Sequence, residues 1–238
     1  MSIITDIFDR FLNLIFPRHC PCCDEITYDN EMICEECHEK LIKLLLQGDI
    51  CKKCGLPRQE CTCKRRVFLF NGITAPFRYQ DEAARGVLNI KKHKSIENAE
   101  FFADFMTDNL QSTFGDVRFD IVTNVPMLPK EDREKDFNHS KILAKLVSSN
   151  INVKYENLLI QTKKRKSQHT LEYNERISNV KGIYKIKGKI DLEGKNILLV
   201  DDIKTSGASL NECAHELLLA GAEGVWCLCA AITCKKTL

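Results

Sequence analysis

The sequence predicts an α/β protein preceded by a small metal-stabilised module, and three observations support this prediction. After residue 67, apolar strand-like runs alternate with amphipathic helical stretches. This alternation is typical of right-handed βαβ units, and so of a mostly parallel sheet with helices on both faces. Residues 197–200 are four apolar residues in succession, as expected of a strand that is buried on both faces. Nine of the 13 cysteines lie between Cys20 and Cys63.

The elements of the α/β part follow one another in a regular order. We expect strands in residues 72–79, 119–126, 182–186, 197–200 and 224–232. We expect helices in residues 81–94, 97–110 and 139–150, and a further helix after the turn that follows residue 204. Ligands of such sheets bind outside the carboxyl ends of the strands, so this edge is where we expect the site.

The composition narrows the class of protein. With 238 residues, of which 44% are hydrophobic and 29% charged, the chain has room for one ordinary domain and a small appendage. A net charge of +2 argues against a positive electrostatic potential over the whole surface, as a nucleic-acid-binding protein would have. No uncharged apolar run reaches membrane-spanning length, so no transmembrane segment is predicted. The sequence does not indicate the oligomeric state.

The first 17 residues are apolar at helical spacing and carry acidic interruptions without a basic start. This pattern indicates an amphipathic helix docked on the body rather than a signal peptide. A role at a membrane surface is the alternative. We therefore expect a cytoplasmic protein.

The early cysteines are arranged in close pairs, and two such pairs supply the four thiolates of one tetrahedral zinc ion. Four pairs therefore predict two structural zinc ions. The simplest pairing is sequential, although an interleaved one stays open, and a disulfide framework is disfavoured in a cytosolic setting. The predicted ligands are Cys20, Cys23, Cys34 and Cys37 for one ion, and Cys51, Cys54, Cys61 and Cys63 for the other.

Cys22 is left over, because the spacing of two residues favours Cys20 as the ligand. The segment is too short for a hydrophobic core and must be held by its metals. The predicted domains are residues 1–66, with the N-terminal helix and double zinc ribbon, and residues 67–238. Cys227 and Cys229 alternate in a strand-like run, which indicates buried core thiols.

The strand of residues 197–200 is followed by Asp201 and Asp202, where we expect it to end, and then by a small, hydroxyl-rich turn that leads into a helix. Backbone N–H groups and the positive end of the helix can hold a phosphate there. The two carboxylates can accept hydrogen bonds from sugar hydroxyls or hold Mg²⁺. An ordinary strand–helix junction with capping side chains is the alternative. The residues of the turn are Thr205, Ser206, Gly207, Ala208 and Ser209.

This segment resembles the signature with which type I phosphoribosyltransferases bind phosphoribosyl pyrophosphate (PRPP). The resemblance implies the three-layer fold of that class, with PRPP and Mg²⁺ as ligands. It implies that the Thr205–Ser209 turn holds the 5′-phosphate and that Asp201 and Asp202 face the ribose hydroxyls as the catalytic pair. Lys204 departs from the pattern, and we expect its side chain to point to solvent.

Two basic stretches accompany the signature. Lys130, Arg133 and Lys135 follow the strand of residues 119–126, where their charges could neutralise a pyrophosphate. The stretch from Lys163 to Lys189 could close over a phosphate-rich substrate or contact nucleic acid. A solvated basic face is the alternative for both.

Nearly the whole chain resembles the ComF family of phosphoribosyltransferase-like proteins, which are linked to natural competence. The features that carry the resemblance are the FPRHC segment, the double zinc ribbon, Lys92 in IKKHK, the loop from Pro126 to Asn138, Gln168, Leu171, Arg176 and Asn179 in their spacing, and VDDIKTSGAS. The positions that depart from the family pattern are Asn124, Asp136, His139 and Arg165.

The resemblance implies a phosphoribosyltransferase that binds PRPP with Mg²⁺ and displaces pyrophosphate at ribose C1, in competence or DNA uptake. The alternative is a non-catalytic interaction protein that contacts single-stranded DNA or a DNA-uptake helicase. The sequence does not indicate the acceptor substrate. The candidates for contact with pyrophosphate or for a lid are Lys92, Arg133, Lys135, Gln168 and Arg176.

Overall fold

The computed structural model describes residues 18–27, 31–61, 63, 67–128, 138–163 and 182–234. The helix predicted in the first 17 residues lies outside these ranges. The described α-helices are α2 (Glu35–Ile42), α3 (Asp81–His93), α4 (Ile96–Phe114), α6 (His139–Asn150) and α8 (Ala208–Leu219). The described strands are β1 (Gly72–Thr74), β2 (Phe77–Arg78), β3 (Ile121–Asn124), β4 (Leu159–Gln161), β5 (Tyr184–Ile186), β6 (Asn196–Lys204) and β7 (Gly224–Ile232).

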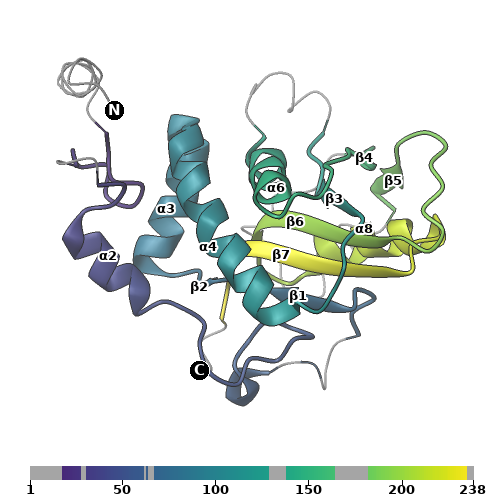
Figure 1. The fold of residues 1–238 in the computed structure, drawn as a ribbon, viewed down its shortest axis with the longest axis horizontal. Coiled ribbons are helices and arrows are strands. Elements are labelled where there is room, and N and C mark those ends of the chain that lie inside the picture. The colour runs from purple at the N-terminus through teal and green to yellow at the C-terminus, as the bar shows by residue number, and fades with distance from the viewer. Residues whose placement is uncertain are drawn as a thin grey trace.

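The main sheet is parallel throughout. Its strands follow the order β1-β7-β6-β3, and β2 also pairs with β7. The two longest strands, β6 and β7, lie side by side in its centre (Figure 1). The predicted mostly parallel sheet is confirmed.

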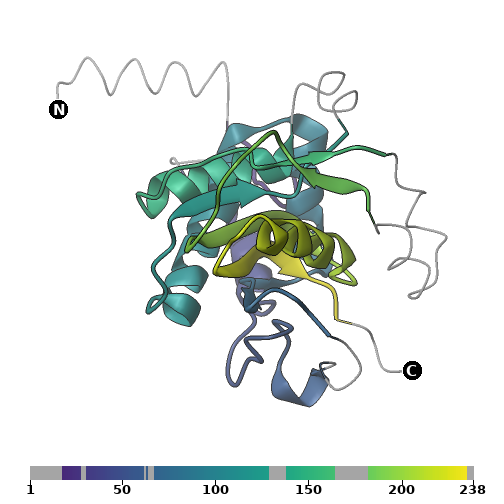
Figure 2. The same cartoon turned by 90° about the vertical axis from the view of Figure 1, so that its right-hand side faces the viewer.

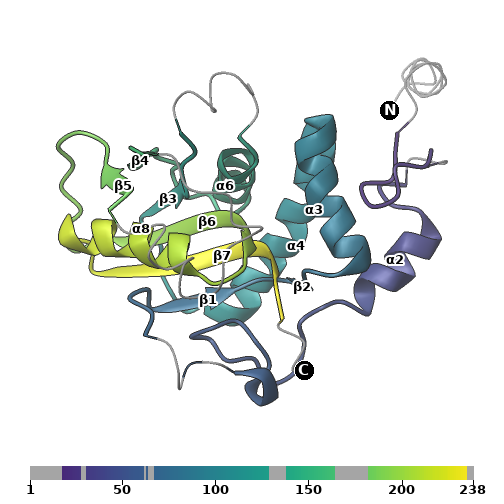
Figure 3. The ribbon, with the colours of Figure 1, turned by 180° about the vertical axis from the view of Figure 1, so that it is seen from behind.

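Helices cover both faces of this sheet, as the unbroken apolar run of β6 requires. Leu198 and Val200 belong to the core that includes residues of α3, α4 and α6. Ile197 and Leu199 belong to the opposite core, which includes residues of α8. Because successive side chains of a strand point to opposite faces, one strand contributes to both cores. Figure 3 shows α8 in front of β6 and β7, on the face away from α4.

Three elements differ from their predicted form. The strand expected in residues 72–79 is divided into β1 and β2 at Ala75 and Pro76, since proline has no N–H to donate to a ladder. The strand of residues 182–186 does not join the main sheet. As β5, it pairs antiparallel with β4, a strand that was not predicted, in a separate two-stranded sheet. β6 continues past its acidic residues to Lys204.

Each cysteine-rich segment packs onto the body on its own side of the sheet. Cys37 and Leu41 of α2 are buried in the core of α3, α4 and α6. Cys51, Cys54 and Leu56 are buried in the core of α8, and their segment forms the lower part of the molecule in Figure 2. The division at residue 66 stays a prediction, because residues 64–66 lie outside the described ranges.

Candidate functional site

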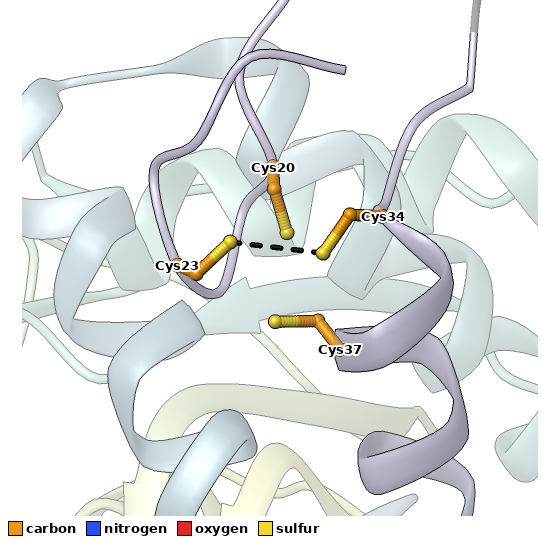
Figure 4. A group of neighbouring side chains, drawn as sticks. All are labelled: Cys20, Cys23, Cys34 and Cys37. Carbon is orange, nitrogen blue, oxygen red and sulfur yellow. Dashed lines mark hydrogen bonds between the residues drawn. The ribbon is translucent and has the colours of Figure 1, made fainter. Parts of the chain in front are cut away.

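The first four predicted zinc ligands converge on one point (Figure 4). Cys20 and Cys23 come from a turn, Cys34 is the residue before α2, and Cys37 lies in its first turn. The Sγ atoms of Cys23 and Cys34 are 3.7 Å apart. Two thiolates on a tetrahedral zinc ion with bonds of about 2.3 Å lie about 3.8 Å apart. The spacing therefore fits one zinc ion and is far too long for a disulfide.

The second four ligands also form one cluster. The Sγ–Sγ distances are 3.7 Å both for Cys51–Cys63 and for Cys54–Cys61. Burial alone would raise the pKa of Cys51, but hydrogen bonds from the backbone N–H groups of Lys53 and Cys54 and from neighbouring thiols lower it to about 7. A lowered pKa favours the thiolate that binds a metal.

The structure thus groups the eight cysteines in the sequential order. Cys22 lies outside both clusters and is 1% exposed in the core beside α3. Cys227 and Cys229 of β7 are completely buried, so their predicted role as core thiols is confirmed.

The acidic pair lies within β6, near its carboxyl end, and α8 begins three residues after the strand. Asp202 is buried, whereas Asp201 is half-buried. The backbone N–H of Asp202 donates to Asp201 Oδ1 over 3.0 Å, and the N–H of Ile203 donates to Asp202 Oδ1 over 2.7 Å. These two bonds fix the orientation of both carboxylates relative to the strand.

Two side chains from other elements also contact Asp202. Lys91, in the last turn of α3, places Nζ 2.5 Å from Asp202 Oδ2. His139, the first residue of α6, places Nε2 3.3 Å from the same oxygen. Burial would raise the pKa of Asp202, but His139 and Lys91 outweigh it and hold this pKa well below its usual range. The carboxylate is therefore ionised at neutral pH.

The turn between β6 and α8 places a glycine at the N-terminus of the helix. Gly207 directly precedes α8 with φ of +79°, a conformation that glycine adopts without strain. The Ala208 N–H donates to Ser206 Oγ over 3.3 Å. The dipole of α8 favours a negative group at this end.

The prediction for Lys204 was wrong, because its side chain is only 1% exposed. β6 continues to this residue, so Lys204 is held in the sheet opposite Ile232 rather than in a free loop. Its ammonium lies over the ring of Phe68, 5.8 Å from the centroid. Such a cation–π contact stabilises a charge that has left water.

Residues 68–70, which follow the second cysteine cluster, pack against the turn between β6 and α8. A Cβ atom on Gly207 would lie 3.1 Å from Phe68 Cε1. The Leu69 N–H donates to Asn211 Oδ1, in α8, over 2.6 Å. Phe68 in turn stacks on Phe70 at 4.8 Å. The Thr205–Ser209 turn therefore rests on residues 68–70.

The remaining predicted site residues either lie away from the acidic pair or fall outside the described residues. Lys92 is exposed on α3, and it is Lys91 that reaches the acidic pair. The sequence analysis did not single out Lys91, although the basic run at the end of α3 was a signal for it. The candidates that lie outside the described residues are Lys130, Arg133, Lys135, Asp136, Arg165, Gln168, Leu171, Arg176 and Asn179.

Asn124, one of the residues that depart from the family pattern, lies inside the protein. Asn124 ends β3 and is 2% exposed. Its Oδ1 accepts a hydrogen bond from Tyr155 Oη over 2.6 Å, and its Nδ2 donates to the Val125 carbonyl over 3.0 Å. The amide is therefore satisfied by its neighbours.

Two family models match the chain. The model of the double zinc ribbon domain matches residues 11–67, and that of the phosphoribosyl transferase domain matches residues 139–237. Together with the parallel sheet and the two cysteine clusters, these matches define the class: a protein with the phosphoribosyltransferase fold and an N-terminal double zinc ribbon with structural zinc.

Two relatives are similar to this chain in sequence. Competence protein ComFC of Bacillus subtilis strain 168 is 26% identical over 205 residues, which are 81% of this chain and 80% of that protein. DNA utilization protein YhgH of Escherichia coli strain K12 is 28% identical over 116 residues, 48% of this chain and 50% of the relative. The chain thus spans about half the length of this second relative. With the two family models, these relatives support a protein of the ComF family.

Solved structures are more distant. Purine phosphoribosyltransferase from Pyrococcus horikoshii Ot3 has a TM-score of 0.36 at 17% identity, covering 56% of this chain and 74% of that one. A second structure, of adenine phosphoribosyltransferase, has a TM-score of 0.40 at 13% identity, covering 61% of this chain and 83% of that one. Likenesses this remote carry no weight for function.

Within the described ranges, no helix combines the length and the apolar character needed to cross a lipid bilayer.

Proposed function

We propose that the protein is a ComF-type phosphoribosyltransferase that binds PRPP at the end of β6. The observation that carries this proposal is the joint placement of an oriented acidic pair, Asp201 and Asp202, and a turn with Gly207 at the N-terminus of α8. A helix N-terminus next to an acidic pair suits a pentose that has a phosphate at one end and hydroxyls at the other. The family of the chain supports the same function.

Each part of the ligand has a matching partner in this proposal. The N–H groups of the Thr205–Ser209 turn would hold the 5′-phosphate. The carboxylates would accept hydrogen bonds from the ribose hydroxyls. Mg²⁺ would enter with PRPP, held by the phosphates of the ligand itself.

The reaction would need no nucleophile from the protein. An acceptor forms a bond to ribose C1 as the bond from C1 to the pyrophosphate oxygen breaks, and pyrophosphate leaves. The protein would contribute position and charge stabilisation. The positive charges at the site include Lys91, whose pKa burial would lower but Asp202 raises.

We expect Asp201→Asn to weaken PRPP binding by on the order of 1–3 kcal/mol, because a carboxylate accepts hydrogen bonds more strongly than an amide oxygen. Calorimetric titration with PRPP and Mg²⁺ measures this change, and pyrophosphate release with a panel of bases and amines tests for transfer. Asp108→Asn, on the exposed side of α4, is the matched control. Equal affinity in both variants would mean that the signature serves only the fold.

A second candidate function follows from the names of the relatives, which refer to competence and DNA utilization. In this candidate the protein contacts single-stranded DNA or a DNA-uptake helicase without catalysis, and the compartment would be the cytoplasm in either case. The basic residues that would make the contact are Lys163, Lys164, Arg165 and Lys166.

Replacing these four residues by alanine separates the two functions. If the stretch is a lid over the substrate, we expect lower turnover and unchanged binding of single-stranded DNA. If it contacts DNA, we expect weaker binding and a salt dependence that is flatter by about 0.7 per lost phosphate contact. We favour the lid, and salt-sensitive DNA binding lost in this variant, in a parent that binds no PRPP, would contradict it.

A further inference from the structure

The inference concerns the three side chains around Asp202, which come from three different elements. Lys91 from α3 and His139 from α6 both face Oδ2, at 2.5 Å and 3.3 Å. Oδ2 itself is fully buried and accepts no hydrogen bond from the described residues, so Lys91 and His139 meet it as ion-pair contacts. Oδ1 accepts the backbone N–H of Ile203.

Lys91 and His139 therefore occupy the surroundings of Asp202 Oδ2. An ionised carboxylate offers about four lone-pair sites. One is taken on Oδ1, and both sites of Oδ2 face positive or N–H-bearing groups. A single site on Oδ1 remains, which is enough for one ribose hydroxyl.

A magnesium ion does not fit this carboxylate. Mg²⁺ requires oxygen ligands at about 2.0–2.1 Å in near-octahedral geometry. An ion on Oδ2 would have to displace the Lys91 ammonium or lie within a few ångströms of it, where like charges repel strongly in a buried setting. The fixed ammonium thus already supplies the positive charge that a metal ion would supply at Asp202.

Lys91 is also accessible from outside. Its side chain is 35% exposed, compared with 12% for Asp202. An ammonium carries three donors, and one side of it faces Asp202. Among the described residues no hydrogen bond ties these donors, so they can reach an anionic group of a ligand bound at the acidic pair.

We propose that Lys91 acts as the built-in cation of the acidic pair: it occupies Asp202 in place of a divalent ion and offers its remaining N–H donors to the diphosphate of a bound sugar phosphate. The inference rests on the proposed function for the identity of the ligand. The occupation of Asp202 by Lys91 is independent of that identity.

The test uses Mn²⁺ alone, so that failure of PRPP binding and failure of this inference can be told apart. Mn²⁺ shares the oxygen ligands of Mg²⁺ and has little preference for thiolates, so the zinc-loaded protein can be titrated while free Mn²⁺ is followed by electron paramagnetic resonance. We expect Lys91→Met to gain one Mn²⁺ site per chain. The double variant Lys91→Met/Asp202→Asn should lose it again.

Lys92→Met is the matched control, because it removes the same charge from the exposed neighbour on α3. We expect it to bind Mn²⁺ as the wild type does. A folded Lys91→Met variant without the additional site would overturn the proposal, and so would an equal gain in Lys92→Met.

If Lys91→Met does not fold, a second comparison that leaves Lys91 unchanged still tests the proposal. We expect the wild type and Asp202→Asn to bind Mn²⁺ with the same affinity, since Asp202 is not a metal ligand while Lys91 is in place. Weaker Mn²⁺ binding by Asp202→Asn would overturn the proposal.

Discussion

Cys61→Ser is expected to release one zinc ion per chain and to destabilise the α/β body together with the second ribbon. Structural zinc contributes apparent free energies of about 10–16 kcal/mol to the folding of small modules. Here Cys51 and Cys54 belong to the same core as Leu199 and Leu217. Loss of the metal therefore removes part of the layer that covers one face of the sheet.

Zinc analysis and hydrogen exchange measure the two effects. We expect faster amide exchange in β1 and α8 as well as in residues 49–63. Cys234→Ser is the matched control, because Cys234 is a half-buried thiol that lies outside both clusters. Faster exchange confined to the ribbon would show instead that residues 1–66 fold independently, as the predicted domain division implies.

The second large effect is expected at Gly207. Alanine at positive φ costs about 1–2 kcal/mol, and the new Cβ atom would also lie 3.1 Å from Phe68 Cε1 and 3.4 Å from Lys204 Cε. The turn must shift to relieve this contact. We therefore expect Gly207→Ala to weaken PRPP binding about tenfold or more, which corresponds to about 1.4 kcal/mol.

Gly188 provides a control that isolates the contact from the backbone strain. Its φ is +80°, close to the +79° of Gly207, and a Cβ atom there would have no heavy atom within 4 Å. Gly188→Ala should therefore lose similar stability by thermal unfolding and keep its affinity for PRPP. A similar loss of affinity in both variants would mean that the packing of Phe68 under the turn is irrelevant to binding.

Local patterns were sufficient to predict the elements of the sheet. The strand of residues 224–232 and the helix of residues 139–150 have the predicted bounds, because hydrophobic periodicity and caps lie within each segment. The resemblance of Asp201, Asp202 and the turn to a known signature depends on contiguous residues as well. The cysteines of each cluster are also close in the chain, so the sequential pairing was the simplest one, although the spacing left an interleaved pairing open.

What could not be predicted depends on contacts between distant segments. Lys204 was expected in solvent because its neighbours are polar, and its burial follows from the pairing of β6 with β7 and from the cover of Phe68. Lys91 and Asp202 are far apart in the sequence, and no periodicity indicates that α3 brings one to the other. The same holds for β4, whose partner β5 lies beyond the undescribed residues 164–181.

The position of β7 in the sheet has a consequence for the order in which the chain folds during synthesis. β7 pairs with β1, β2 and β6, yet it is the last described strand to be made. β1 and β2 must therefore wait for their sheet partner until residue 232 is translated, although they already bond to residues 44–52, and sheets with such distant pairings form slowly. The cysteine clusters are complete much earlier, and metal binding supplies folding free energy as soon as their ligands are made. Zinc would thus begin to order the segment of residues 44–52, which holds β1 and β2 until β7 is made.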